Sequence, residues 1–310
     1  MTHTILNQSD IQKRIPHRFE NALLDSCTIL EPGNGKGDTL ITQDDPSGRQ
    51  LFTWSPTDDS HALLTPASME IMALLSIATT GAVKEGENAF FAAISNFKRE
   101  NGQLNTADRL NCHARRASDK GGFLMYKGTM DSAQGNARGD VMAFYTDMNT
   151  ETDTQEAKKT DLPDMPLSDT IAPPKSKDSC MFLCDRIRAI TDTNIITEYT
   201  YPNDHPLTRG HFPDRAIMMG IMQWMIAEDA AYAISVKKDL TGHQTIKGDA
   251  TLIKDDGSIV CDMKRLSIEV WRNHNEHHDG ASTLSAKRIA FKSVVVPGDT
   301  LILKLNFTIE

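Results

Sequence analysis

The chain of 310 residues is poor in cysteine and has no long, uninterrupted apolar run. Its five cysteines are odd in number and irregularly spaced, and no second Cys/His pair follows Cys180 and Cys184 to complete a zinc site. We therefore expect reduced cysteines, no bound metal and a cytoplasmic location. A membrane-spanning helix needs about 20 consecutive apolar residues. Since the sequence offers no such run, no membrane span is expected.

Positive charge is also in deficit. The 33 Lys and Arg residues against 42 Asp and Glu residues give a net charge of −9. Without a long basic run, such a chain is a poor binder of nucleic acid or anionic membranes. The opening residues MTHTILNQSDIQKRIPHRF lack the apolar core of a secretory signal, so none is expected. With 39% hydrophobic and 24% charged residues, a packed core is expected and wholesale disorder is excluded.

The length predicts two domains, at roughly 150 residues each. Residues 151–178 are polar, contain four prolines and show no apolar period, so they are predicted to form a linker or surface excursion. The predicted domains are therefore residues 1–150 and 179–310.

Each half contains one long apolar segment, at residues 66–83 and 219–236, and neither has a polar stripe. A helix that is apolar on most sides is buried on most sides. Strand-like segments follow each helix. The sequence thus predicts an α+β fold made of a duplicated unit, in which an antiparallel sheet wraps one buried helix. The predicted strands are 88–101, 108–118, 122–130, 140–147, 245–253, 258–271, 287–296 and 300–309.

One segment carries a chemical motif. Gly210-His211-Phe212-Pro213 precedes the second helix, and Gly220 follows nine residues after His211 at the start of that helix. This pattern resembles the 3-hydroxyacyl-ACP dehydratases of bacterial fatty-acid synthesis, which are hotdog-fold enzymes. Patches at 182–187 and 291–301 extend the resemblance, and 15–18 and 97–99 are weaker copies in the first half. The resemblance implies two tandem hotdog domains, which form an intrachain pseudo-dimer and leave a further homo-oligomer open.

The chemistry of dehydration requires a base for the C2 proton and a group that polarises the thioester carbonyl. Histidine suits the base role because its ordinary pKa lies near neutrality. The resemblance assigns this role to His211. It assigns carbonyl polarisation to the backbone N–H of Gly220, since a helix N-terminus favours a developing enolate oxygen. No metal or redox cofactor is implied.

The family also uses a carboxylic acid, 14 residues after the motif histidine, on the helix of the partner hotdog. That position is Met225 here and, by alignment of the halves, Met72 in the first helix, and neither donates a proton. Glu70 and Asp229, with Glu228 beside it, are the nearby acids. In a tandem hotdog His211 faces the first helix, which favours Glu70. A structural interpretation of Glu70, as a charge that favours the helix N-terminus, stays open.

A second site is predicted to have lapsed. No Gly-His-Phe-Pro precedes the first helix, and alignment places Asp58 where the histidine would be. His61 is close, but a surface histidine is the favoured interpretation. The loop His274–Asp279 lacks metal-binding helical spacing and is predicted to be solvated. Gly33–Gly37 lacks the Lys-Ser/Thr of a phosphate loop and is predicted to form a turn.

Substrate contacts are predicted for Phe212 and Pro213 and for an acyl tunnel of methionines, although core packing explains those methionines equally well. The methionines in question are Met69, Met72, Met218, Met219, Met222 and Met225. An acyl-ACP or acyl-CoA would be the partner. Docking of an acidic carrier would need basic side chains, for which the candidates are Arg209, Arg215, Lys237, Lys238 and Arg265. Ordinary solvated surface charge explains these side chains equally well.

The second half departs from the family in strand order, because about 50 residues separate its helix from Phe291-Lys292. Either the strands are permuted or a hairpin is inserted. The leading hypothesis is a lyase that converts a 3-hydroxyacyl thioester to the trans-2-enoyl thioester in fatty-acid or related synthesis. A thioesterase or hydratase on the same fold, and a degenerate acyl-binding or assembly subunit, are the alternatives.

Overall fold

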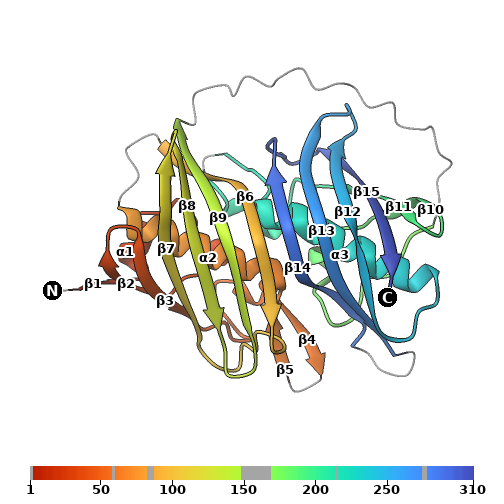
Figure 1. Cartoon of the computed structure of the whole chain (residues 1–310), viewed down its shortest axis with the longest axis horizontal. Helices are drawn as coiled ribbons and strands as arrows, with labels where there is room; N and C mark the ends of the chain where they lie inside the picture. Colours follow the sequence, from red (N-terminus) through yellow and green to blue (C-terminus); the bar gives the residue numbers. More distant parts are fainter. Residues whose placement is uncertain (1–2, 58–59, 82–86, 148–168, 214, 274–277) are drawn as a thin grey trace.

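In the computed structural model, one continuous antiparallel sheet carries two long helices on one face (Figure 1). The structure describes residues 3–57, 60–81, 87–147, 169–213, 215–273 and 278–310. No helix in these ranges is both long and apolar enough to cross a membrane. Mostly antiparallel strands with few helices agree with the predicted α+β class, and the arrangement is compatible with a tandem hotdog.

The helices are α1 (Gln8–Gln12), α2 (Thr65–Thr80) and α3 (Gly220–Lys237), with short 3-10 turns at Phe19–Asn21, Arg49–Phe52, Ser179–Met181 and Pro206–Arg209. The strands of the first half are β1 (Thr4–Asn7), β2 (Ser26–Glu31), β3 (Asn34–Thr39), β4 (Thr53–Thr57), β5 (Ser60–Leu63), β6 (Glu87–Glu100), β7 (Leu110–Lys120), β8 (Phe123–Asp131) and β9 (Asn136–Asp147). Those of the second half are β10 (Arg186–Ile190), β11 (Asn194–Thr200), β12 (Gly242–Lys254), β13 (Ile259–Arg272), β14 (Gly280–Phe291) and β15 (Thr300–Ile309).

The large sheet joins the two halves edge to edge. Its order is β1-β2-β3-β7-β8-β9-β6-β14-β13-β12-β15-β11-β10, and β6 pairs with β14 at the junction. In the first half the strand after the helix, β6, lies at the junction. In the second half the chain after α3 forms β12 and β13 first, and only the third strand, β14, lies at the junction. The strand order of the second half is therefore permuted, one of the two alternatives that the sequence left open.

Both long helices are buried along nearly their whole length. Every residue from Thr65 to Thr79 of α2 is buried, as is every residue from Ile221 to Ser235 of α3. Hydroxyls on α2 turn back onto helix carbonyls: Ser68 Oγ donates to Thr65 O at 2.6 Å and Ser76 Oγ to Met72 O at 2.7 Å. These two hydroxyls are thus satisfied inside the helix, so α2 can bury them in the core without a polar face.

Glycines in the sheet let α2 lie close to it. A Cβ on Gly35 would lie 2.5 Å from Thr79 Cγ2, and one on Gly37 would lie 3.1 Å from Leu75 Cδ1, both on α2. Both glycines belong to β3, while the chain reverses at Gly33, whose φ is +79°. The prediction of a turn over Gly33–Gly37 is therefore wrong beyond Gly33, because close packing and not reversal requires the later glycines.

The described end of the predicted linker packs against both halves. Ser55 N donates to Ser176 O at 2.7 Å, which ties this segment to β4. The ammonium of Lys177, with a side chain only 7% exposed, lies 2.8 Å from Asp229 Oδ1 on α3. Asp229 Oδ2 also accepts from Leu183 N at 2.7 Å. A buried charge needs such compensation, so Asp229 is occupied by a structural ion pair.

Glu228 provides a testable consequence of burial. Its Oε1 accepts from both Thr283 N and Thr283 Oγ1 at 2.7 Å, and burial raises the pKa of its carboxyl from 4.5 to about 7. Since the folded pKa lies above the unfolded one, the fold loses stability as pH rises from about 4.5 to about 7. Glu228→Gln keeps the acceptor oxygen and removes the titration. Its unfolding free energy relative to wild type is expected to rise by up to about 3 kcal/mol between pH ~4.5 and ~8.

Urea unfolding at both pH values measures this difference. If the unfolding free energies of Glu228→Gln and wild type differ by the same amount at both pH values, burial of an ionisable carboxyl at this position is contradicted.

Candidate active site

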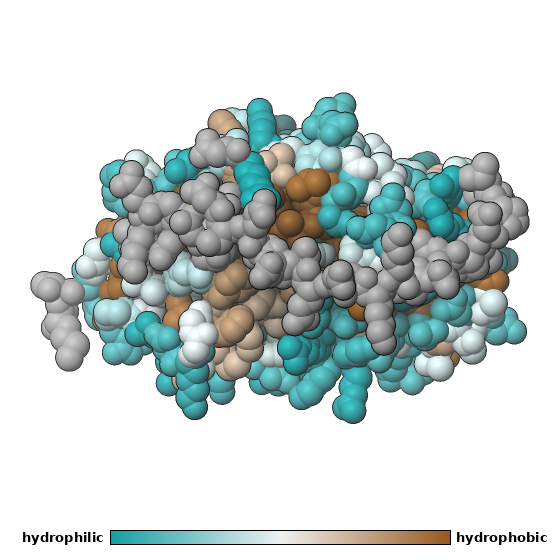
Figure 2. Space-filling model, turned by 90° about the horizontal axis from the view of Figure 1, so that it is seen from above, coloured by the Kyte–Doolittle hydropathy of each residue, from teal (hydrophilic) through white to brown (hydrophobic). Residues whose placement is uncertain are grey.

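A cavity of about 180 Å³ lies between the halves, at the N-terminus of α3. Side chains of α2, β6, β9 and β14 line it together with the motif loop. Five of the lining side chains are phenylalanines, Phe90, Phe91, Phe144, Phe212 and Phe291. Strand β6 begins and β14 ends at the upper edge of Figure 1, and the view from above shows hydrophobic surface near the middle of that face (Figure 2). The site is thus an apolar cavity that both halves build.

His211 enters this cavity from the loop before α3. Its side chain is buried, and its Nδ1 lies 2.8 Å from the carbonyl oxygen of Ile217. A carbonyl only accepts, so Nδ1 carries the proton and the neutral ring keeps its lone pair on Nε2. The next residue, Phe212, has a φ of +55°. Such a conformation is rare for a bulky side chain and persists only where the surrounding structure holds it.

The protonation state of His211 can be tested. Burial first, and then the neighbouring ring of His17, lower the pKa of His211 from 6.5 to about 3. Because the folded pKa is depressed, neutral His211 contributes stability above pH 6.5 that is lost as pH falls toward 3. We expect the ¹⁵N shifts of His211 to stay those of a neutral Nδ1–H ring from pH ~8 to ~5, whereas histidines of the urea-unfolded chain titrate near 6.5. Titration of His211 near 6.5 in the folded chain would contradict this burial.

Glu70 reaches the same cavity from α2. The residue is only 1% exposed, and its Oε2 has no hydrogen-bond partner among the described residues. Met72, two positions later, is turned about 200° around the helix. It points at the sheet, where a Cβ on Gly128 would lie 2.5 Å from its Sδ. Glu70, and not Met72, therefore faces the cavity.

A second histidine, His17, lies beside Glu70. Its Nε2 is 3.3 Å from Glu70 Oε1, although the atoms are not aligned as a hydrogen bond, and its ring centroid is 5.0 Å from that of His211. Arg18 N donates to Gly210 O at 3.0 Å, which docks this segment on the motif loop. A Cβ on Gly210 would lie 2.2 Å from Arg18 O, so the motif glycine makes the docking possible. Sequence reasoning gave His17 no role, since the only signal was a weak family-like patch at 15–18.

The N-terminus of α3 completes the site. Gly220 is the first residue of the helix and lines the cavity, and a Cβ there would lie 3.3 Å from the ring of Phe291. Gln223, one turn later, also lines the cavity, and its buried Oε1 has no partner in the described part of the chain. The unpaired N–H groups of a helix's first turn present partial positive charge, which suits an oxyanion.

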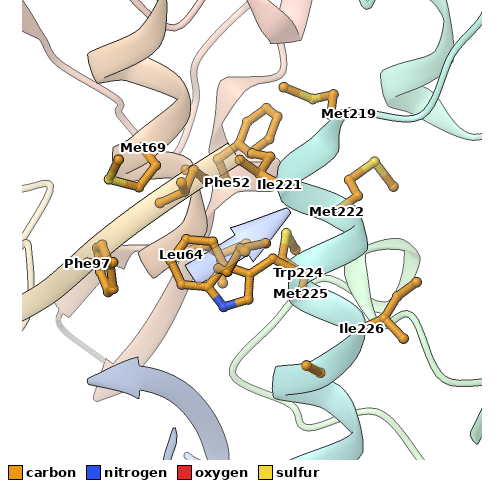
Figure 3. Close-up of a cluster of buried hydrophobic side chains, with 14 of the residues drawn as sticks. Phe52, Leu64, Met69, Phe97, Met219, Ile221, Met222, Trp224, Met225 and Ile226 are labelled. Atoms are coloured by element: carbon orange, nitrogen blue, oxygen red, sulfur yellow. The ribbon is translucent and has the colours of Figure 1, made fainter. Parts of the chain in front are cut away.

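The other predicted substrate contacts lie elsewhere, apart from Phe212. Pro213 is exposed and does not line the cavity. Met219 and Met225 lie in the buried hydrophobic cluster of Figure 3, as Met69 and Met222 do. Among the predicted tunnel methionines only Met218 lines the cavity. Methionine fills irregular gaps in a core, and that is its role at these positions.

The other acids and histidines singled out in the sequence have separate places in the structure. Asp229 and Glu228 are held by Lys177 and Thr283 and do not line the cavity. His61 Nδ1 lies 3.0 Å from Ser55 Oγ on the β4–β5 hairpin. Asp58 and residues 274–277 lie outside the described residues. Within the described residues, no group of three or more His, Cys, Asp and Glu side chains is placed to hold a metal ion, and all five cysteines are free thiols.

Comparisons with known proteins identify no family for this chain. No protein-family model and no curated protein matches the chain. Among solved structures, the dehydratase domain of RzxB from Pseudomonas fluorescens is 10% identical over 93% of this chain and 99% of its own, with a TM-score of 0.42. A trans-acyltransferase polyketide synthase enoyl-isomerase is 10% identical over 86% of this chain and 98% of its own, with a TM-score of 0.40. At these values the likeness assigns a role to no residue.

Proposed function

We propose that this chain is a tandem pair of hotdog units that dehydrates a 3-hydroxyacyl thioester to the trans-2-enoyl thioester. The observation that carries the proposal is the meeting of His211 from the second half and Glu70 from the first half at one apolar cavity. A base for the C2 proton and an acid for the C3 hydroxyl are the two groups that this elimination requires.

His211 is the base. With Nδ1–H fixed on the Ile217 carbonyl, Nε2 is free to take the C2 proton. Burial keeps the ring neutral, as a base must be before reaction. The low pKa also makes it a weak base, so removal of the C2 proton depends on stabilising the charge that develops on the thioester carbonyl.

The backbone N–H of Gly220 supplies that stabilisation. As the first residue of α3 it presents its N–H where the helix macrodipole is positive. Because Gly220 has no Cβ, the ring of Phe291 can lie close to the helix N-terminus, where a Cβ would come within 3.3 Å of it. Glu70 then protonates the departing C3 hydroxyl, which leaves as water. No other carboxylate lines the cavity in the described part of the chain.

An acidic acyl carrier protein is the proposed donor of the substrate, with acyl-CoA as the alternative donor. Exposed Arg215 and Lys292 lie at the opening of the cavity beside exposed Val294. Of the basic residues predicted from the sequence, Arg215 lines the cavity and Arg265 does not. Arg209 forms an ion pair with Glu20, Lys237 with Asp169 and Lys238 with Asp192.

The test is a product assay. Purified protein is mixed with a 3-hydroxyacyl thioester, and conjugated enoyl absorbance and free thiol are followed together. Enoyl product without thiol release supports the dehydratase. Thiol release identifies a thioesterase, and the lack of both products identifies a non-catalytic acyl-binding subunit, so that either result would overturn the proposal.

A further inference from the structure

The dehydration proposed above leaves His211 protonated and Glu70 deprotonated. His211 Nε2 gains the C2 proton, the C2–H electron pair becomes the C2=C3 double bond, and the C3–O bond breaks with its pair. Glu70 gives its proton to the departing oxygen, which leaves as water. One proton must therefore pass from His211 to Glu70 before the next turnover.

Bulk water has poor access to these groups. His211 is 8% exposed, His17 is 3% exposed and Glu70 is 1% exposed, and phenylalanines line much of the cavity around them. A proton that returned through solvent would cross this apolar lining. A protein group between the two partners offers a shorter route.

His17 occupies that place. Its ring centroid is 5.0 Å from that of His211, and its Nε2 is 3.3 Å from Glu70 Oε1. The two rings share no direct hydrogen bond, so a proton would pass between them through one bridging water molecule. Both ring nitrogens of His17 are buried and lack a hydrogen-bond partner among the described residues. One nitrogen can therefore accept a proton while the other donates one.

The backbone holds His17 in this position. Arg18 N donates to Gly210 O, and the Arg18 guanidinium donates to His17 O at 2.8 Å. The other charged side chains that line the cavity are Arg215 and Lys292, which are exposed at its opening.

We propose that His17 is a relay that returns the proton from His211 to Glu70 between turnovers, which rests on the function proposed above. Such a residue acts after the chemical step. Its loss leaves the first turnover intact and slows the following ones, whereas loss of a merely structural residue slows both.

The experiment mixes His17→Gln rapidly with excess 3-hydroxyacyl thioester. Glutamine keeps hydrogen-bonding capacity but carries no exchangeable acid proton at neutral pH. We expect a burst of about one enoyl product per chain at a rate within roughly twofold of wild type, followed by a steady state at least roughly tenfold slower than wild type. Glu70→Gln should show no burst. His113→Gln, at a half-buried histidine outside the cavity, should match wild type.

Equal slowing of the first and later turnovers by His17→Gln would assign His17 a structural role and overturn the relay. A steady state unchanged from wild type would overturn it too. Should His17→Gln fail to fold, His17→Asn serves in the same measurement. Wild-type protein that forms no enoyl product would overturn the proposed function instead, so the two failures are distinguishable.

Discussion

Replacing His211 with asparagine is expected to lower kcat for dehydration by about a thousandfold, within the range measured for loss of a general base. The asparagine amide can still donate to Ile217 O, the acceptor of the native Nδ1–H. The substitution thus removes the basic nitrogen and leaves the local hydrogen bond. Because the substrate still enters the same apolar cavity, KM should change far less than kcat.

The control for this variant is His243→Asn, since the side chain of His243 is 72% exposed and does not line the cavity. It should retain wild-type kcat. Wild-type activity in His211→Asn, with normal folding by circular dichroism, would remove His211 from the mechanism.

Glu70→Gln is expected to lower kcat by about a hundredfold to a thousandfold, because an amide does not protonate a leaving hydroxyl. The volume and the acceptor oxygen beside His17 are kept, so the loss would be one of chemistry. The apparent stability should not fall, since the variant removes a carboxyl group whose buried Oε2 has no hydrogen-bond partner among the described residues. Steady-state enoyl formation and thermal unfolding measure the two quantities.

Glu228→Gln is the matched control, because Glu228 is an equally buried carboxylate on the other helix that does not line the cavity. Its kcat should stay within about twofold of wild type. An equal loss of kcat in Glu70→Gln and Glu228→Gln would show that the loss comes from removing a buried carboxyl group in general, and not from removing the acid at the cavity.

Much of the secondary structure could be predicted because burial leaves a strong mark on the sequence. The two helices lack a polar face, and most strands after them carry β-branched or aromatic residues, although β7 has none. The start of β14 could not be predicted in this way. Gly280 there fits against Trp271, and Ser282 bonds to Thr65, so small polar residues occupy a buried strand.

The site was predictable only in part. The motif pointed to His211 and Gly220, and helical geometry explains why Glu70, rather than Met72, faces the cavity. His17 carries no comparable signal, because its meeting with His211 depends on the docking of Arg18 on Gly210 across the two halves. The methionines were ambiguous because the same apolar side chain suits a core and a tunnel.

The most direct test of proton abstraction at C2 is the reverse reaction in D₂O. A trans-2-enoyl thioester is incubated with the protein, and the 3-hydroxyacyl product is analysed by mass spectrometry and NMR. If His211 carries the C2 proton, wild-type protein forms product with one deuterium at C2 in each molecule, and His211→Asn does not form this product. Hydrated product that gains deuterium at C2 equally fast in both proteins, or no hydration by wild type, would contradict it.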